Sequence, residues 1–153
     1  MASAKLDFIN MIKIYTDGAC SGNPGVGGWG LVILDNSNKP ILLNGGEKNT
    51  TNNRMELKAA INAVKYFSTK KNLEIFTDSK YLKDGIESWI KNWKKNGWKT
   101  SNKKPVKNKD LWVELDIEIS KHNVKWNWVK GHANNEYNEK ADNLARKYIE
   151  ERF

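Results

Sequence analysis

The sequence predicts an α/β fold with a five-stranded mixed sheet, in which three antiparallel strands are followed by two parallel strands and helices flank the sheet. The first part of the chain holds short apolar runs separated by turn residues, which is typical of hairpin-linked strands. The later part alternates short apolar strands with amphipathic helices, which is typical of parallel strands joined by crossovers. Together the two patterns favour one mixed sheet with helices on its faces.

The first three strands are expected at Met11–Ala19, Gly28–Asp35 and Pro40–Glu47, with a turn between the second and the third. The glycine-rich stretch 25–30 matches a dinucleotide-binding pattern. That pattern must open a helix, however, and this stretch leads into an apolar strand. We therefore interpret it as a flexible hairpin that lets the backbone come close to a ligand.

The remaining elements follow from apolar periodicity. A helix over 52–68 has its apolar residues on one face, and a buried strand covers 73–77. Asp78 or Ser79 would cap the next helix, which Gly85 would end. We expect a short helix at 89–95, a helix at 110–121, a strand at 124–129 and a terminal helix at 135–150.

Length and composition predict one domain over residues 11–153, preceded by a short extension of residues 1–10. The single cysteine, Cys20, excludes an internal disulfide and suits a reducing compartment. No apolar run approaches the length of a membrane span, and the first ten residues lack the apolar block of a secretory signal. These features favour a cytoplasmic protein.

The net charge of +8 is concentrated in one window. Between Lys91 and Lys109 lie eight of the 26 basic residues and none of the 18 acidic ones, so the rest of the chain is formally neutral. Trp93 and Trp98 lie inside the window, and interleaved lysines and aromatics suit a nucleic acid. The alternative is a solvated lysine face whose tryptophans belong to the core.

Four carboxylates lie in positions suited to an active site. Asp17 and Asp78 fall where apolar strands stop, whereas Glu56 and Asp142 lie in amphipathic helices. Strand ends and helix starts converge on one edge of an α/β sheet. Four acids there would repel one another unless a hard divalent cation lay between them. The pattern therefore predicts a metal site.

Each candidate also has an ordinary structural explanation. His132 lies in a loop after a strand, where a lone histidine is usually solvated. What favours a site is that five polar candidates fall near one sheet edge. The alternatives for the acids are a hairpin turn at Asp17-Gly18, a capping box of Asn53 and Glu56, a helix cap at Asp78, and a surface ion pair of Asp142 with Arg146.

The chain closely resembles type I ribonuclease H, which cuts RNA within RNA–DNA hybrids. The lysine-rich window, within about 89–109, is similar to the basic protrusion of the bacterial members. The resemblance implies the ribonuclease H-like fold for residues 11 to about 148. The segments that carry it are Thr16–Gly25, Thr50–Leu57, Phe76–Tyr81, Trp93–Lys99, Val129–Ala133 and Asn138–Ala145.

The resemblance implies a monomeric, two-metal endoribonuclease that leaves 5′-phosphate and 3′-hydroxyl ends. Asp17 would bridge two Mg²⁺ ions, with Mn²⁺ as a possible substitute. Asp142 would complete the ion site that holds the attacking water, and Glu56 and Asp78 the site at the leaving oxygen. His132 would move protons or help to release product.

The resemblance also implies how the hybrid is held. Little base-edge chemistry is needed, so cleavage should depend weakly on sequence. Lys80 departs from the family, in which glutamine is common at this place. A phosphate contact would then replace the hydroxyl contact. The RNA strand would meet Cys20, Gly22, Asn23, Asn52 and Lys80; a DNA phosphate would meet Thr51, Asn53 and Arg54; and the rest of the DNA strand would meet Trp89, Lys94, Lys95, Trp98, Lys99 and Lys104.

Two other functions remain open at this point. The chain could be a non-catalytic hybrid- or duplex-binding protein that uses the basic protrusion alone, although all four carboxylates are present. It could also be a DNA-cutting or strand-transfer enzyme of the wider superfamily, which shares the acidic site. The asparagines that would read the hybrid and the basic protrusion argue against the second possibility.

Overall fold

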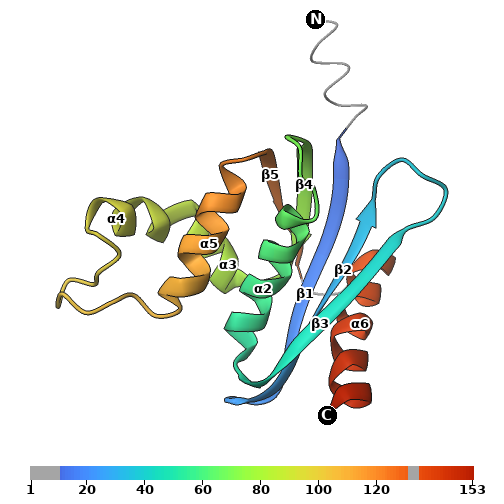
Figure 1. The fold of residues 1–153 in the computed structure, drawn as a ribbon, viewed down its shortest axis with the longest axis horizontal. Coiled ribbons are helices and arrows are strands. Elements are labelled where there is room, and N and C mark those ends of the chain that lie inside the picture. The colour runs from blue at the N-terminus through green and yellow to red at the C-terminus, as the bar shows by residue number, and fades with distance from the viewer. Residues whose placement is uncertain (1–10, 131–134) are drawn as a thin grey trace, which may run out of the picture.

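A computed structural model describes residues 11–130 and 135–153 and contains one five-stranded sheet in the order β3-β2-β1-β4-β5 (Figure 1). The strands β1 and β2 and the strands β2 and β3 pair antiparallel, whereas β4 pairs parallel with both β1 and β5. The predicted fold class is confirmed. The strands are β1 (Ile12–Gly22), β2 (Gly25–Leu34), β3 (Ile41–Thr50), β4 (Asn72–Thr77) and β5 (Asn123–Trp128).

Helices cover both faces of this sheet (Figure 1). On one face lie α2 (Asn52–Lys65) and α5 (Lys109–Ile119), and on the other lies α6 (Glu136–Arg152). A third helical stretch runs away from the sheet and forms the base of the protrusion. It consists of α3 (Lys80–Asp84), the π-helical turn η1 (Gly85–Trp89) and α4 (Ile90–Lys95).

Alternation along β1 directs its side chains into two separate cores. Ile14 is fully buried in the core that α2 covers, together with residues of β2 and β4. Its neighbour Tyr15 belongs to the core beneath α6, where its ring stacks on that of Phe76 with centroids 4.4 Å apart. The central strand is thus fixed from both faces just before it reaches Asp17.

Gly85 does not end a helix, contrary to the sequence prediction. The chain continues through η1 into α4, and Gly85 has ordinary right-handed helical angles. A Cβ atom at this position would lie 2.0 Å from the ring of Trp112. The glycine is therefore explained by close packing against an indole ring rather than by helix termination.

The glycines of residues 25–30 do not form a flexible hairpin, which corrects a second prediction. They lie within β2, paired on both sides. Cβ atoms at Gly28 and Gly30 would each lie 2.2 Å from a carbonyl oxygen of α6, those of Ala145 and Ala141. The close approach that these glycines permit is therefore to a helix and not to a ligand.

Replacing Gly30 by alanine should lift α6 from the sheet. The added methyl group would overlap the Ala141 carbonyl, so we expect a loss of roughly 1–3 kcal/mol in the free energy of unfolding. Urea denaturation followed by circular dichroism measures this loss. Gly28→Ala meets the same helix one turn further on and should behave alike. An unchanged denaturation midpoint in both variants would contradict this account of the packing.

Within the described ranges, no helix is long and apolar enough to cross a membrane.

Candidate metal centre and nucleic-acid interface

Three carboxylates meet where β1 and β4 run side by side. Tyr15 of β1 is paired with Phe76 of β4 in parallel register, so Asp17 and Asp78 each lie two residues beyond a paired position. Glu56 comes from the second turn of α2, which packs against β1. One oxygen from each of Asp17, Glu56 and Asp78 lies within 4.8 Å of the other two.

The backbone of Gly18 links two of these acids. Its N–H donates to Asp17 Oδ1 at 2.9 Å and to Glu56 Oε1 at 3.1 Å. A Cβ atom on Gly18 would lie 2.5 Å from the backbone nitrogen of Glu56 and from the carbonyl carbon of Met55. Only glycine therefore lets α2 approach β1 closely enough to place both carboxylates around one point.

Burial and like charge make this cluster costly without a cation. Burial, together with the charge of Asp78, raises the pKa of Asp17 to about 7, although a hydrogen bond with Glu56 opposes the increase. Burial and the nearby Asp17 carboxylate raise the pKa of Glu56 well above its ordinary value. Glu56 Oε2 is buried and has no hydrogen-bond partner among the described residues. An oxygen-seeking cation would relieve each of these costs.

The fourth acid, Asp142, lines the same cavity but is bound to an arginine. The cavity measures about 490 Å³ and contains all four carboxylates. Arg146 Nε donates to Asp142 Oδ1 at 3.2 Å, and Arg146 Nη2 lies 2.6 Å from Asp142 Oδ2. The ion pair considered as an alternative for Asp142 is therefore present, and the acid borders the candidate site as well.

The ordinary explanations for the other three acids are not realised. Asp17 lies inside β1 and not in a hairpin turn. The cap of α2 is Thr51, whose hydroxyl accepts from Arg54 N at 3.2 Å, so Glu56 takes no part in a capping box. Ser79 rather than Asp78 caps α3, accepting from Leu82 N at 3.1 Å. His132 lies outside the described residues.

Four of the residues predicted to meet the hybrid line the large cavity. These are Cys20, Asn52, Asn53 and Lys80, although Asn53 is expected at the DNA phosphate rather than at the RNA strand. Gly22, the last residue of β1, has a φ of 90°, and the peptide bond between Asn23 and Pro24 in the following turn is cis. Asn23 Oδ1 accepts from Asn52 N at 3.4 Å, which joins that turn to the start of α2.

A second, smaller cavity of about 80 Å³ lies beside the first. It contains Thr51 and Asn53, as expected for a phosphate site, but Arg54 does not line it. The Arg54 guanidinium is held by Asp110 at 2.8 and 3.0 Å and by Asn108 Oδ1 at 3.2 Å. These contacts fix the Arg54 side chain beside the cavity, and its contact with a DNA phosphate stays a prediction.

Two residues of this cavity were missed by the sequence analysis, Lys107 and Asn108. Lys107 lies within the lysine-rich window and could have been singled out there. Asn108 begins α5 in a left-handed conformation, with φ of 59°. Its Nδ2 donates to the Tyr81 hydroxyl at 3.0 Å, a tertiary contact that local sequence does not signal.

The protrusion has an aromatic interior and a lysine exterior. Trp93 lies between Trp89, Trp98 and Trp112, with ring centroids 5.6–6.1 Å away. Trp112 is fully buried, and its Nε1 donates to the Tyr81 hydroxyl at 2.9 Å. Trp93 and Trp98 are half-buried and pack against the core cluster that contains Trp112, so both tryptophans of the window belong in part to the core.

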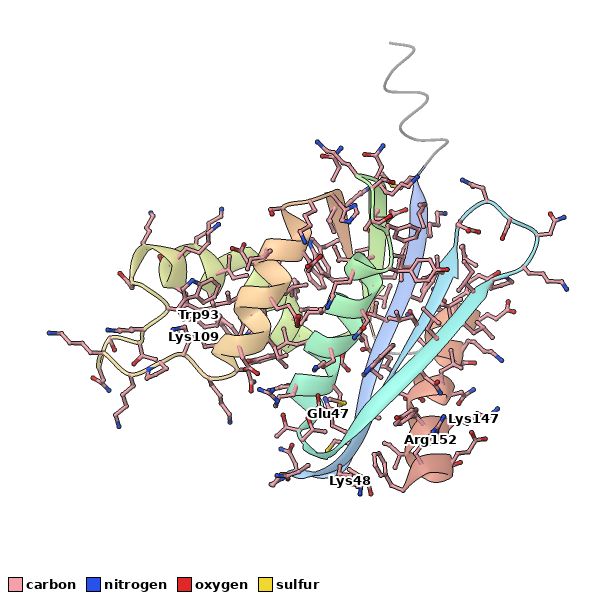
Figure 2. All side chains as sticks on the ribbon, viewed as in Figure 1. Glu47, Lys48, Trp93, Lys109, Lys147 and Arg152 are labelled. Atoms are coloured by element: carbon pink, nitrogen blue, oxygen red, sulfur yellow. The ribbon has the colours of Figure 1, made fainter. Side chains whose placement is uncertain are left out.

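A groove of about 430 Å³ crosses the base of the protrusion. Its lining includes Trp89, Trp93 and Lys107, so aromatic faces and an ammonium group border one channel. Lys94, Lys95, Lys99 and Lys104 are all exposed, and of these Lys94 lies 3.4 Å from Asp116. Figure 2 shows the side chains of the loop between α4 and α5 spreading outward beyond Trp93 and Lys109.

Comparisons with known proteins agree with this geometry. A family model described as RNase H matches residues 10–150. A ribonuclease H of Francisella philomiragia subsp. philomiragia is 59% identical over 143 residues, which is 93% of each chain.

Solved structures give the same result. The type 1 RNase H called LC9-RNase H1, which carries the type 2 active-site motif, is 32% identical with a TM-score of 0.78, and the match covers 90% of this chain and 71% of that one. LC11-RNase H1, solved in complex with an RNA/DNA hybrid, is 22% identical with a TM-score of 0.68 over 92% of this chain and 98% of that one, and supports the fold. The chain belongs to the ribonuclease H family.

Proposed function

We propose that this protein is a ribonuclease H that hydrolyses the RNA strand of RNA–DNA hybrids with two metal ions and with little dependence on sequence. The observation that carries the proposal is the cluster of Asp17, Glu56 and Asp78, whose oxygens lie within 4.8 Å of one another. The family assignment supports the reaction class, and the cluster supplies carboxylates that could bind the metal ions.

The donor set fits a hard divalent cation such as Mg²⁺, because it consists of carboxylate oxygens and includes the buried, unpartnered Glu56 Oε2. Asp17 would serve both ions, Glu56 and Asp78 one of them, and Asp142 the other. Bound ions would stabilise charge on the attacking and leaving oxygens of the phosphodiester. Mn²⁺ is a possible substitute for Mg²⁺.

The chain's own groups would orient the reaction. The Gly18 N–H fixes one oxygen each of Asp17 and Glu56, so each carboxylate keeps a second oxygen that would bind a metal ion. His132, which follows β5 in the sequence, would move a proton at the attacking water or the product phosphate. The products would carry 5′-phosphate and 3′-hydroxyl ends.

The hybrid would be held on three neighbouring surfaces. The RNA strand would cross the large cavity at the backbone near Cys20 and Gly22, with Asn23, Asn52 and Lys80 contacting it. One DNA phosphate would enter the small cavity, where Lys107 supplies an ammonium group among Thr51, Asn53 and Asn108. The remaining DNA strand would follow the groove past Trp89 to the exposed lysines of the protrusion.

A cleavage assay tests the reaction. The same sequence is presented as RNA–DNA hybrid, RNA duplex and DNA duplex, with and without Mg²⁺. We expect cleavage of the RNA strand of the hybrid alone, and only with the ion. Cleavage of the DNA duplex would favour the wider superfamily instead, and binding without cleavage would favour a non-catalytic protein.

Neutralising the exposed lysines should weaken binding of the hybrid without changing the chemistry. For a variant with Lys95, Lys99, Lys104 and Lys107 replaced by glutamine, we expect the KM to rise about tenfold or more near 0.15 M salt, with little change in kcat. The slope of log K against log salt should flatten by about 0.9 for each phosphate that the protein no longer neutralises. Titrations at several salt concentrations measure this slope.

The matched control removes four exposed lysines from the opposite end of the sheet, Lys13, Lys39, Lys70 and Lys71. It carries the same net charge as the test variant and should keep the wild-type slope. Equal effects in both variants would show that total charge matters rather than the protrusion. If neither variant changed the slope, the window would be a solvated face.

We further propose that residues 11–153 act as one ribonuclease H domain, with residues 1–10 as a short extension. We also propose that the protein is a monomer and that it works in the cytoplasm, a reducing compartment that its single cysteine, Cys20, suits. Sedimentation of the purified protein tests the monomeric state, and imaging of the tagged full chain in its host tests the location.

A further inference from the structure

Asp142 shares a hydrogen bond with Asp17, but unlike the other three carboxylates it is also held by an arginine. Both of its oxygens are taken by one guanidinium, with Arg146 Nε 3.2 Å from Oδ1 and Nη2 2.6 Å from Oδ2. Asp142 is absent from the set of acids whose oxygens lie within 4.8 Å of one another among the described residues. Arg146 is thus ion-paired with the acid that lies at the border of the cluster.

The helix itself sets up this contact. Residues four apart lie on the same side of an α-helix, so Arg146 reaches Asp142 from one turn later on α6. Arg146 also lines the large cavity, so its charge lies at the candidate metal centre and not only on the outer surface. The positive charge of the guanidinium at this place opposes the arrival of a cation.

The exposure of the pair makes the contact exchangeable. The Arg146 side chain is 63% exposed, whereas that of Asp142 is only 14% exposed. The guanidinium can therefore move into water without a large desolvation cost, while the carboxylate stays in the cavity. The geometry suits a partner that can be displaced rather than a permanent support.

We propose that Arg146 competes with the divalent cation for Asp142. Without substrate, one ion binds readily at the cluster of Asp17, Glu56 and Asp78. The site that Asp142 completes fills only at a higher ion concentration, after the guanidinium has left. This inference rests on the proposed two-metal function, because it assumes that Asp142 is a metal ligand. Arg146 acts through Asp142 and is a positioning residue.

Ion binding measured without substrate tests the proposal directly. Mn²⁺ is titrated into the full-length protein and followed by calorimetry and by the spin-resonance signal of the free ion. For Arg146→Gln we expect the weaker Mn²⁺ site to bind about tenfold more tightly, because the variant lacks the positive charge that repels the cation. Arg146→Lys keeps the charge but loses the two-point contact, and should lie between this variant and wild type.

The matched control is Arg152→Gln, which removes an arginine from the end of the same helix. The Arg152 guanidinium lies over the Tyr148 ring, 5.6 Å from its centroid, and Figure 2 shows it near the end of α6. This variant should bind Mn²⁺ as wild type does. An equal gain in both variants would overturn the proposal, because the effect would then come from net charge.

A second comparison tests whether the effect passes through Asp142. In an Asp142→Asn background, Arg146→Gln should give no further gain in Mn²⁺ affinity, since the competed ligand is gone. A gain that persists there would overturn the proposal. Unchanged affinity in Arg146→Gln would mean an ordinary surface ion pair, and weaker binding would mean that Arg146 orients Asp142 for the metal. Both outcomes contradict competition.

Failure of the proposed function would look different. The two-metal function would be wrong if wild type cleaved no hybrid and if Asp17→Asn bound Mn²⁺ as well as wild type did. If wild type cleaved the hybrid but Arg146→Gln bound Mn²⁺ no more tightly, only the competition would be wrong.

Discussion

Asp17→Asn should fold normally and lose cleavage of the hybrid by at least about 10³-fold, since it removes the charge that both ions share. The asparagine oxygen can still accept the hydrogen bond from Gly18 N, so the local backbone should be kept. The expected result is an inactive protein with a native circular dichroism spectrum. The measurement is the initial rate of RNA cleavage at saturating Mg²⁺ and hybrid.

Asp35→Asn is the matched control, because it removes an acid from the turn between β2 and β3. Asp35 Oδ1 accepts from Ser37 N at 3.2 Å, and Asp35 does not line the cavity of the four acids. This control should keep the wild-type rate. Mg²⁺-dependent cleavage by Asp17→Asn at a rate near that of wild type would exclude the two-metal proposal.

Asp17→Asn should also be more stable than wild type, increasingly so as the pH rises from about 4 to about 7. The pKa of Asp17 is about 7 in the folded protein, against an ordinary value of 3.8, so folding requires proton uptake between these limits. The contribution of Asp17 to stability is therefore lost as the pH rises through this window. At pH 8 the gain for the variant should be about 1–4 kcal/mol, since one pKa unit corresponds to about 1.4 kcal/mol.

Urea denaturation at several pH values, without divalent ions, measures this difference. Subtracting the pH profile of wild type from that of Asp17→Asn cancels the contribution of groups that both proteins share. Asp110 is an example, since Arg54 lowers its pKa and it therefore stabilises the fold as the pH rises. Added Mg²⁺ should stabilise wild type and reduce the difference, because a bound cation favours the ionised carboxylates. A difference that does not change with pH would contradict the electrostatic account of the cluster.

The topology could be predicted from sequence because apolar periodicity is local. Strand β4 and helix α2 are examples, since each shows its period within its own residues. The glycines could not be interpreted this way. Gly85 and Gly30 carry the same local signal as a helix stop or a turn, yet each is explained by a partner distant in the chain, Trp112 and Ala141.

The candidate site shows the same division. The motifs around Asp17, Glu56 and Asp78 indicated acids that the structure does bring together. The part played by Arg54 depends on Asp110 and Asn108, more than fifty residues away, and no periodicity reports such contacts. The ion pair of Asp142 with Arg146 was foreseen from its spacing, but that it borders a cavity was visible only in three dimensions.

The four acids come from β1, α2, the end of β4 and α6, so they are contributed across almost the whole length of the chain. During synthesis, Asp17 leaves the ribosome long before Asp142 has been added. A chain made only as far as Asp78 already carries the three acids whose oxygens lie within 4.8 Å of one another in the folded protein, but it lacks the fourth. The full set of four candidate acids is therefore assembled only when α6 docks, and until then the chain lacks the acid proposed to complete the second ion site.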